Sequence, residues 1–133
     1  MIAVDTSAIV AVLLREPDRR RFLSYMVTTP RLCVSAPTLV ELRIVAYSKL
    51  GSSHEGEVRA LLEGVWIGVL DFTEAQSSIA ADAWRRYGRG SGRAAKLNFG
   101  DCFSDALARS LDAPLLFMGD DFLAPDVTAA LSL

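Results

Sequence analysis

Residues 1–8, Met-Ile-Ala-Val-Asp-Thr-Ser-Ala, contain the pattern that decides the fold of this chain. The apolar run Ile2–Val4 has the length of a buried strand. Helical periodicity follows at once, and Thr6 or Ser7 can cap a helix over Ala8–Leu14. A strand that passes directly into a helix begins a βα unit, so this pattern favours a parallel sheet covered by helices.

The rest of the chain repeats this alternation. Three further apolar runs have the length of buried strands, and they are Leu32–Val34, Trp66–Leu70 and Leu115–Met118. Segments of helical period separate them, over Pro17–Met26, Thr38–Leu50, Glu55–Leu62 and Thr73–Tyr87, and a last helix is opened by Asp101. The alternation predicts an α/β sandwich with a mainly parallel central sheet flanked by helices.

Length and composition set the class of the protein. With 133 residues, of which 51% are hydrophobic, the chain is expected to form a single domain over residues 1–133. A net charge of −2 argues against a general polyanion binder but allows a local basic patch. The first residues lack a basic leader and a long apolar stretch, which predicts a cytoplasmic protein. Cys33 and Cys102 lack a CxxC partner and are expected to be buried free thiols.

Several carboxylates lie at positions from which the expected fold could bring them together. Asp5 follows the first strand, and Asp120 and Asp121 follow the last one. Glu41 interrupts a strongly apolar helix, and Asp101 lies at the start of another. Because sites in parallel sheets form beyond the carboxyl ends of the strands, these acids can converge on one edge. Mutual repulsion would then require a counterion, and a hard divalent cation such as Mg²⁺ or Mn²⁺ would supply it.

Each acid also has a structural interpretation. Asp5 could cap the first helix, Asp101 could favour the positive end of its own helix, and the Gly119-Asp120-Asp121 stretch could be a plain turn. Glu41 could pair with a distant arginine. Asp105 follows Asp101 by one helical turn and is either a solvated residue or an acid that supports the site.

A basic segment precedes the last acidic helix. Between positions 83 and 100 the chain has five cations and no acid, interleaved with Trp84, Tyr87 and Phe99. Positive charge beside aromatic rings suits single-stranded nucleic acid, and a solvated flexible loop explains the same pattern. Asn98 could hold a phosphate or cap the following helix.

Four strings of this sequence together resemble those of one known family. They are Met-Ile-Ala-Val-Asp-Thr-Ser-Ala, Ser-Ala-Pro-Thr-Leu-Val-Glu-Leu, Leu-Asn-Phe-Gly-Asp-Cys and Leu-Leu-Phe-Met-Gly-Asp-Asp-Phe. In content, order and spacing they closely resemble the VapC toxins of the PIN-domain family, over nearly the whole length of the chain. The resemblance implies a PIN-like three-layer sandwich and a magnesium- or manganese-dependent endoribonuclease of a toxin–antitoxin pair. It also implies a homodimer and inhibition by a cognate VapB-like antitoxin.

The resemblance assigns roles position by position. Asp5, Glu41, Asp101 and Asp121 match the acidic catalytic residues of the family, and Asp5 and Asp101 would hold the metal. Asp120 occupies a position that varies in the family. The sequence departs from the family pattern at Met118, where Lys is frequent, at Asp105, where an aromatic residue is frequent, and at Pro125, where Thr is frequent.

Two other functions compete with this interpretation. A phosphohydrolase of the haloacid dehalogenase type would also place an aspartate after the first strand, but it needs a second carboxylate two residues later, where this chain has Ser7. A PIN module that binds RNA or a protein partner without cleaving RNA would keep the fold and lose turnover. The presence of all four acids argues against such a loss.

Overall fold

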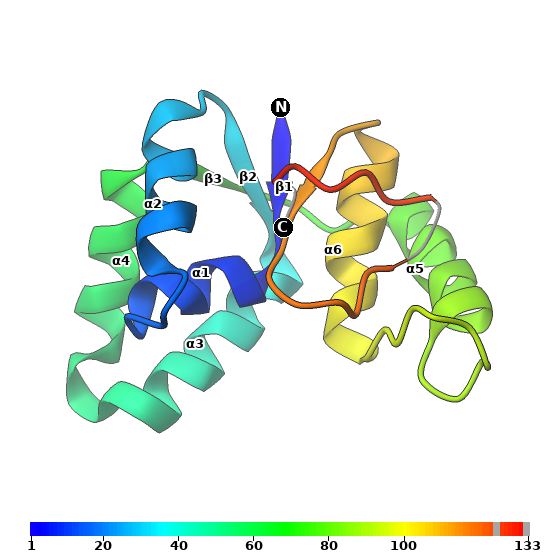
Figure 1. Cartoon of the computed structure of the whole chain (residues 1–133), viewed down its shortest axis with the longest axis horizontal. Coiled ribbons are helices and arrows are strands. Elements are labelled where there is room, and N and C mark those ends of the chain that lie inside the picture. Colours follow the sequence, from blue (N-terminus) through cyan, green and yellow to red (C-terminus); the bar gives the residue numbers. More distant parts are fainter. Residues whose placement is uncertain (124–125, 132–133) are drawn as a thin grey trace.

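The computed structural model describes residues 1–123 and 126–131. Its sheet has four parallel strands in the order β3-β2-β1-β4, which places the first strand of the sequence in the interior of the sheet (Figure 1). The strands are β1 (Ile2–Val4), β2 (Leu32–Ser35), β3 (Ile67–Leu70) and β4 (Leu115–Leu116). The predicted α/β class with a parallel sheet is confirmed.

Helices cover both faces of the sheet. They are α1 (Thr6–Leu13), α2 (Arg19–Thr28), α3 (Ala36–Leu50), α4 (His54–Gly64), α5 (Glu74–Tyr87) and α6 (Phe99–Ser110), with a 3₁₀ turn η1 (Gly51–Ser53) between α3 and α4. Figure 1 shows α1 to α4 on one side of the strands and α5 with α6 on the other. The fold is therefore the expected three-layer sandwich. Within the described residues, no helix has both the length and the apolar character needed to cross a membrane.

The alternation of side chains along the strands divides the core in two. Val4 and Val34 face a cluster that includes Ile9, Phe22 and Leu42 from the first helical layer. Ala3 and Cys33 face the second layer, where Tyr87, Leu97, Ala106 and Leu107 are buried. Cys33 and Cys102 are both buried free thiols, as predicted.

Helix starts differ from the prediction in two places. The N-cap of α1 is Asp5, whose carboxylate accepts a hydrogen bond from the Ser7 N–H, so the expected cap by Thr6 or Ser7 is wrong. Helix α6 begins at Phe99 and is capped by Asn98, which places Asp101 in its first turn instead of at its start. In both cases the side-chain oxygen of an earlier residue, one or two positions before the expected cap of α1 and three positions before Asp101, reaches the free N–H groups of the first turn.

Asp105 is fully buried, so the solvated position that the sequence left open for it is excluded. Its Oδ1 accepts a hydrogen bond from Arg109 at 3.3 Å, one turn along α6. Arg109 also pairs with Asp82 of α5 at 3.6 Å and with Asp126 of the C-terminal segment at 4.0 Å. Arg86 joins the same two acids, at 3.5 and 3.1 Å. This ion-pair cluster ties α5, α6 and the C-terminal segment together.

Removing the cation of the buried Arg109–Asp105 pair should lower the free energy of unfolding more than removing the cation of the exposed Arg85–Asp82 pair. Arg109→Met leaves the buried Asp105 carboxylate without its cation and should lower the free energy of unfolding by about 3–5 kcal/mol at pH 7. Arg85→Met breaks the Arg85–Asp82 pair, in which the arginine side chain is 77% exposed, and should cost at most about 1 kcal/mol. Urea unfolding followed by circular dichroism measures both, and equal losses would contradict the structural role of Asp105 and Arg109.

Candidate active site at the carboxyl edge of the sheet

The strand order brings the predicted acids to one place. From β1 the chain proceeds to β2 and β3 on one side of the sheet and then crosses back to β4 on the other side of β1, so the strand order reverses at β1. Such switch points form crevices beyond the carboxyl ends of parallel strands. Asp5 follows β1, and its backbone N–H donates to the Leu116 carbonyl of β4 at 2.9 Å. Glu41 comes from α3, which leaves β2 at the same edge, and Asp101 comes from the first turn of α6.

Asp5 is held in one orientation by donors from two helices. Asp5 is buried, with 2% of its surface exposed. Oδ2 accepts hydrogen bonds from the Ser7 N–H at 3.0 Å and the Ser7 hydroxyl at 2.7 Å, and Oδ1 accepts one from the Ser104 hydroxyl at 2.6 Å. Ser104 Oγ lies 3.4 Å from Thr38 Oγ1 of α3. The carboxylate is thus both a helix cap and the centre of a network that links α1, α3 and α6.

Glu41 faces the same region from α3. Thr6 of α1 donates its hydroxyl to Glu41 Oε1 at 2.5 Å. Gly100 lies so close to this carboxylate that a Cβ at position 100 would overlap it. The absence of a side chain at Gly100 is therefore what lets the first turn of α6 approach Glu41.

Asp101 is the acid of the site whose pKa is clearly raised. Its Oδ2 accepts from the Asn98 N–H, and the Asn98 side chain accepts from the Asp101 N–H, each at 2.9 Å. Burial and then the charge of Asp5 raise the pKa of Asp101 to about 7, with further contributions from Asp121 and Glu41, while the hydrogen bond from the Asn98 backbone opposes the rise. The charges of the other three predicted acids therefore all act on Asp101 at this edge.

The last turn distinguishes the two neighbouring aspartates. Gly119 has φ of 95°, a conformation that glycine adopts readily, and it turns the chain back after β4. Asp120 is exposed, whereas Asp121 is partly buried and its charge acts on Asp101. The Asp121 carbonyl accepts a hydrogen bond from the Lys96 N–H at 3.0 Å, which fixes this turn against the loop before α6.

The acids have the charge to attract a divalent cation but do not form a complete protein cage. The ion pairs between described residues join arginines to Asp82, Asp105 and Asp126, and the four site acids take no part in them. Over residues 1–123 and 126–131, no group of three or more His, Cys, Asp or Glu side chains is arranged to hold a metal ion by itself. Mg²⁺ usually binds one or two carboxylates and keeps several waters. The uncompensated charge around Asp101 fits such an ion.

Sequence reasoning missed the hydroxyl groups that orient the acids. Ser7, Thr38 and Ser104 position Asp5, and Thr6 positions Glu41. Thr38 precedes Glu41 by three residues and Ser104 follows Asp101 by three, so helical spacing places each on the same face as an acid. This spacing is the signal that could have identified them.

A groove opens beside the acids. It has a volume of about 1080 Å³, lies between α3 and the start of α6, and is lined by residues that include Val40, Glu41, Ile44, Phe72, Phe99 and Phe103. Phe103 contacts both Phe72 and Phe99 edge to face, with ring centroids 5.0 Å apart in each pair. Phe99 remains 76% exposed. The groove therefore combines one site acid with an accessible aromatic wall.

Comparison with known proteins identifies the family of this chain. The family model described as PIN domain matches residues 2–127. The VapC ribonuclease Mb2780c of Mycobacterium bovis is 40% identical over 127 residues, which are 96% of this chain and 97% of that protein. The chain belongs to the VapC ribonucleases of the PIN-domain family. Ribonuclease VapC of Mycolicibacterium smegmatis is 38% identical over 96% of this chain and 98% of that protein.

Solved structures show the same fold at lower sequence identity. VapC20 of Mycobacterium tuberculosis, described as a sarcin-ricin loop cleaving toxin, superposes with a TM-score of 0.75 at 19% identity, over 92% of this chain and 93% of VapC20. A chain of VapBC2 from Rickettsia felis, solved bound to a promoter DNA fragment, gives 0.76 at 16% identity over 97% of both chains.

The family resemblance expected from the sequence is confirmed, and so is the class of enzyme, a ribonuclease of the VapC toxins. Membership in the PIN-domain family removes the haloacid dehalogenase alternative. PIN-domain ribonucleases generally depend on a divalent metal, which matches the uncompensated carboxylates around Asp101.

The pKa of Asp101 predicts how stability depends on pH when metal is chelated. Between the ordinary carboxyl pKa and about 7, the folded protein holds a proton on Asp101 that the unfolded chain releases, so stability falls as pH rises through this range. Asp101→Asn keeps an oxygen for the Asn98 N–H and loses this titration. In EDTA, the Tm of Asp101→Asn minus that of the wild type should grow as pH is raised from 4 to 8, and parallel Tm curves would contradict the raised pKa.

Proposed function

We propose that this chain is the toxin of a type II toxin–antitoxin pair, a single PIN domain that cleaves RNA phosphodiesters inside the cytoplasm with Mg²⁺ or Mn²⁺. The observation that carries the proposal is the gathering of Asp5, Glu41 and Asp121 around the buried Asp101, where burial first and then the charges of these acids raise the pKa of Asp101 to about 7. A buried edge that gathers like charges without an arginine or lysine counterion favours binding of a hard cation. The identity of the relatives as VapC ribonucleases supports RNA as the substrate.

Each acid has a separate part in the proposed reaction. Asp5 and Asp101 would hold the ion, because Asp5 is locked by the Ser7 and Ser104 hydroxyls and Asp101 by the Asn98 N–H. The bound ion would lower the pKa of a water and stabilise the leaving oxygen of the phosphodiester. Glu41 and Asp121 would orient that water, and one of them would accept its proton. Asp105 is excluded from these roles because it is fully buried against Arg109.

Removal of either proposed ligand tests the reaction. Asp5→Asn and Asp101→Asn should each lower the rate of RNA cleavage at least 100-fold, because each removes a ligand charge while an amide oxygen keeps part of the hydrogen bonding. The Tm in EDTA should not fall for Asp101→Asn. Cleavage is measured on total RNA with Mg²⁺, Mn²⁺ or EDTA, and Asp120→Asn is the matched control that should retain activity.

The competing function is a PIN module that binds RNA without cutting it. The same experiment separates the two, because such a module would bind RNA equally with and without metal and would leave the RNA intact. Metal-dependent cleavage that survives in both Asp5→Asn and Asp101→Asn would show that the nuclease site lies elsewhere.

An antitoxin partner and a homodimer complete the proposed function. Solved relatives of this fold include toxin–antitoxin complexes, such as one from Klebsiella pneumoniae with a TM-score of 0.70. An antitoxin arginine entering the acidic site would replace the charge of the metal and inhibit cleavage. Phe22 and Met26 of α2 are not available for such a contact, because both are buried in the core.

The homodimer would use the apolar face beside the groove. Val40, Ile44 and Tyr47 of α3 are 57%, 63% and 63% exposed, and they occupy one stripe of that helix. Phe99 and Trp84, which are 76% and 47% exposed, extend the apolar surface onto α6 and α5. Contiguous apolar surface of this kind is uncommon on monomers and marks a protein contact.

Ile44→Asp should convert the dimer to a monomer, because a carboxylate at the centre of this face would be buried without a partner. Val27→Asp makes the same change at a residue of α2 that is equally exposed, at 62%, and should leave the mass unchanged. Light scattering coupled to gel filtration measures both. A wild-type monomer, or an Ile44→Asp dimer, would remove α3 from the proposed interface.

A further inference from the structure

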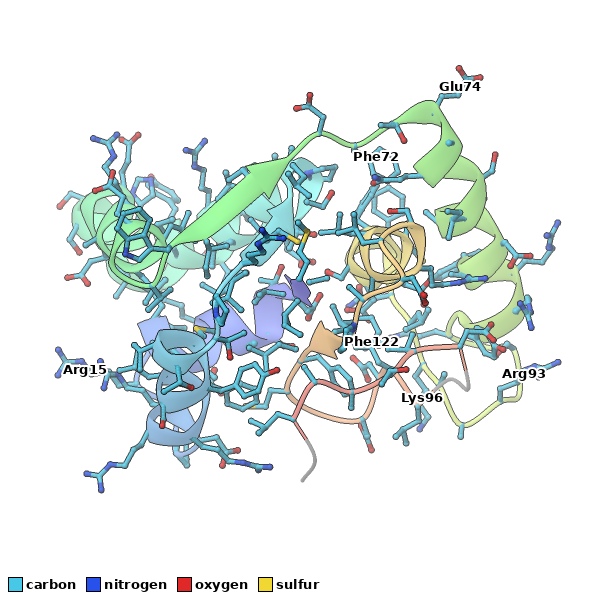
Figure 2. The ribbon with its side chains drawn as sticks, turned by 90° about the horizontal axis from the view of Figure 1, so that it is seen from above. Arg15, Phe72, Glu74, Arg93, Lys96 and Phe122 are labelled. Atoms are coloured by element: carbon cyan, nitrogen blue, oxygen red, sulfur yellow. The ribbon has the colours of Figure 1, made fainter. Side chains whose placement is uncertain are left out.

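Figure 2 shows Arg93 and Lys96 on the opposite side of the molecule from Arg15. They belong to the basic loop, which we define as residues 88–97, between α5 and the Asn98 cap of α6. The five cations between positions 83 and 100 fall into two groups, according to whether they form ion pairs. Arg85 and Arg86 are neutralised by Asp82 and Asp126. Arg89, Arg93 and Lys96 form no ion pair with a described residue.

The basic loop has a defined shape. Its two ends are joined by hydrogen bonds from Arg89 N–H to the Leu97 carbonyl and from Leu97 N–H to the Tyr87 carbonyl, both at 3.0 Å. Gly90 and Gly92 have φ of 88° and 80°, which bend the chain between the cations. The Arg93 guanidinium lies 5.6 Å from the centre of the buried Tyr87 ring. Arg89, Arg93 and Lys96 line a hollow of about 540 Å³, which is large enough for a phosphate group with its waters.

The basic loop is attached directly to the acidic edge. Lys96 N–H donates to the Asp121 carbonyl at 3.0 Å, and Asn98 at the end of the loop bonds Asp101. A hollow with three uncompensated positive charges therefore lies beside a cluster of negative charges, in a chain of net charge −2. A phosphodiester strand needs this arrangement, because a cation neutralises the reacting phosphate at the acids while neighbouring phosphates require basic side chains of their own.

We propose that the basic loop is a binding subsite for the phosphate backbone of the substrate, on the strand next to the phosphodiester that is cut. The inference rests on the proposed ribonuclease function. Arg89, Arg93 and Lys96 contact phosphates without reading bases, so they set affinity and the direction in which the strand leaves the acids, and not the sequence that is cut. Single-stranded RNA is the class of substrate that can follow a loop of this size while its scissile phosphate reaches a recessed edge.

Matched charge variants test the subsite. The loop variant carries Arg89→Gln, Arg93→Gln and Lys96→Gln. The control variant carries Arg15→Gln, Arg20→Gln and Arg31→Gln, three exposed arginines in α2 or directly after α1 and α2, which lie on the opposite side of the strands from α5 and α6 (Figure 1). Binding of a fluorescent single-stranded RNA is measured by anisotropy in EDTA at several salt concentrations, so that the result does not depend on turnover.

The loop variant should bind RNA about 10-fold more weakly than the control variant at 0.15 M salt. The slope of log affinity against log salt should be smaller in magnitude by about 2 in the loop variant. Each phosphate contact on a single strand contributes about 0.7 to that slope, and the variant lacks three cations. KM for cleavage should rise by a similar factor while kcat changes less than threefold, since the acids are untouched. An RNA with methylphosphonates next to the cut site should remove the difference between the wild type and the loop variant.

Several results would overturn the subsite. Equal affinity and equal salt slope for the loop and control variants would do so even if the wild type cleaves RNA. Weaker binding of an acidic peptide by the loop variant, with RNA affinity unchanged, would assign the loop to a protein partner instead. RNA binding that depends on the loop, without metal-dependent cleavage by the wild type, would support the subsite and contradict the proposed nuclease.

Discussion

Electrostatic repulsion between carboxylates is the constraint on which the site depends. Asp5 and Asp101 are 2% and 6% exposed, and the charges of Glu41 and Asp121 act on Asp101 as well. Placing these groups together raises the free energy of the folded state unless a proton or a cation compensates. The fold holds them there through backbone and hydroxyl donors to Asp5, Glu41 and Asp101, which orient the oxygens while leaving the charge uncompensated. An edge built in this way would attract positive charge, such as the proposed metal ion.

The distribution of arginines follows from the same constraint. Arg86 and Arg109 pair with Asp82, Asp105 and Asp126 in the ion-pair cluster of α5, α6 and the C-terminal segment, which compensates the charge of these acids. Arg89, Arg93 and Lys96 lie close to the site in the chain but pair with none of its acids. This separation keeps the acidic edge available to a cation and the basic loop available to an anion, and a bound phosphodiester strand would use both.

The sequence predicted the class of fold well because the informative signals are local. Short apolar runs separated by helical segments specify a parallel sheet, and the runs Ile2–Val4 and Leu32–Val34 lie within the observed strands. The last run was overestimated, since β4 ends at Leu116 and the chain has already begun its turn at Met118, whose N–H donates to the Ser7 hydroxyl. The helix starts were left open by the sequence, because Asp5 and Asn98 each serve both a helix start and the acidic edge, and the structure confirms the alternatives in which these two residues are the caps.

The acids themselves were identified from sequence, whereas their partners depended on tertiary contacts. Ser104 lies 99 positions after Asp5, and no local pattern joins them. The burial of Asp105 could not be predicted from the sequence either, because it depends on Arg109 and on how α5 packs against α6. The family motifs predicted which acids form the site, and the strand order β3-β2-β1-β4 explains why these acids meet.

The most direct test of the account is an anomalous difference map from a crystal of the wild-type protein soaked in manganese. The account predicts a peak between the Asp5 and Asp101 carboxylates, within coordination distance of both, with waters completing its shell. A well-ordered site at saturating manganese, with no peak between these two side chains, would contradict it.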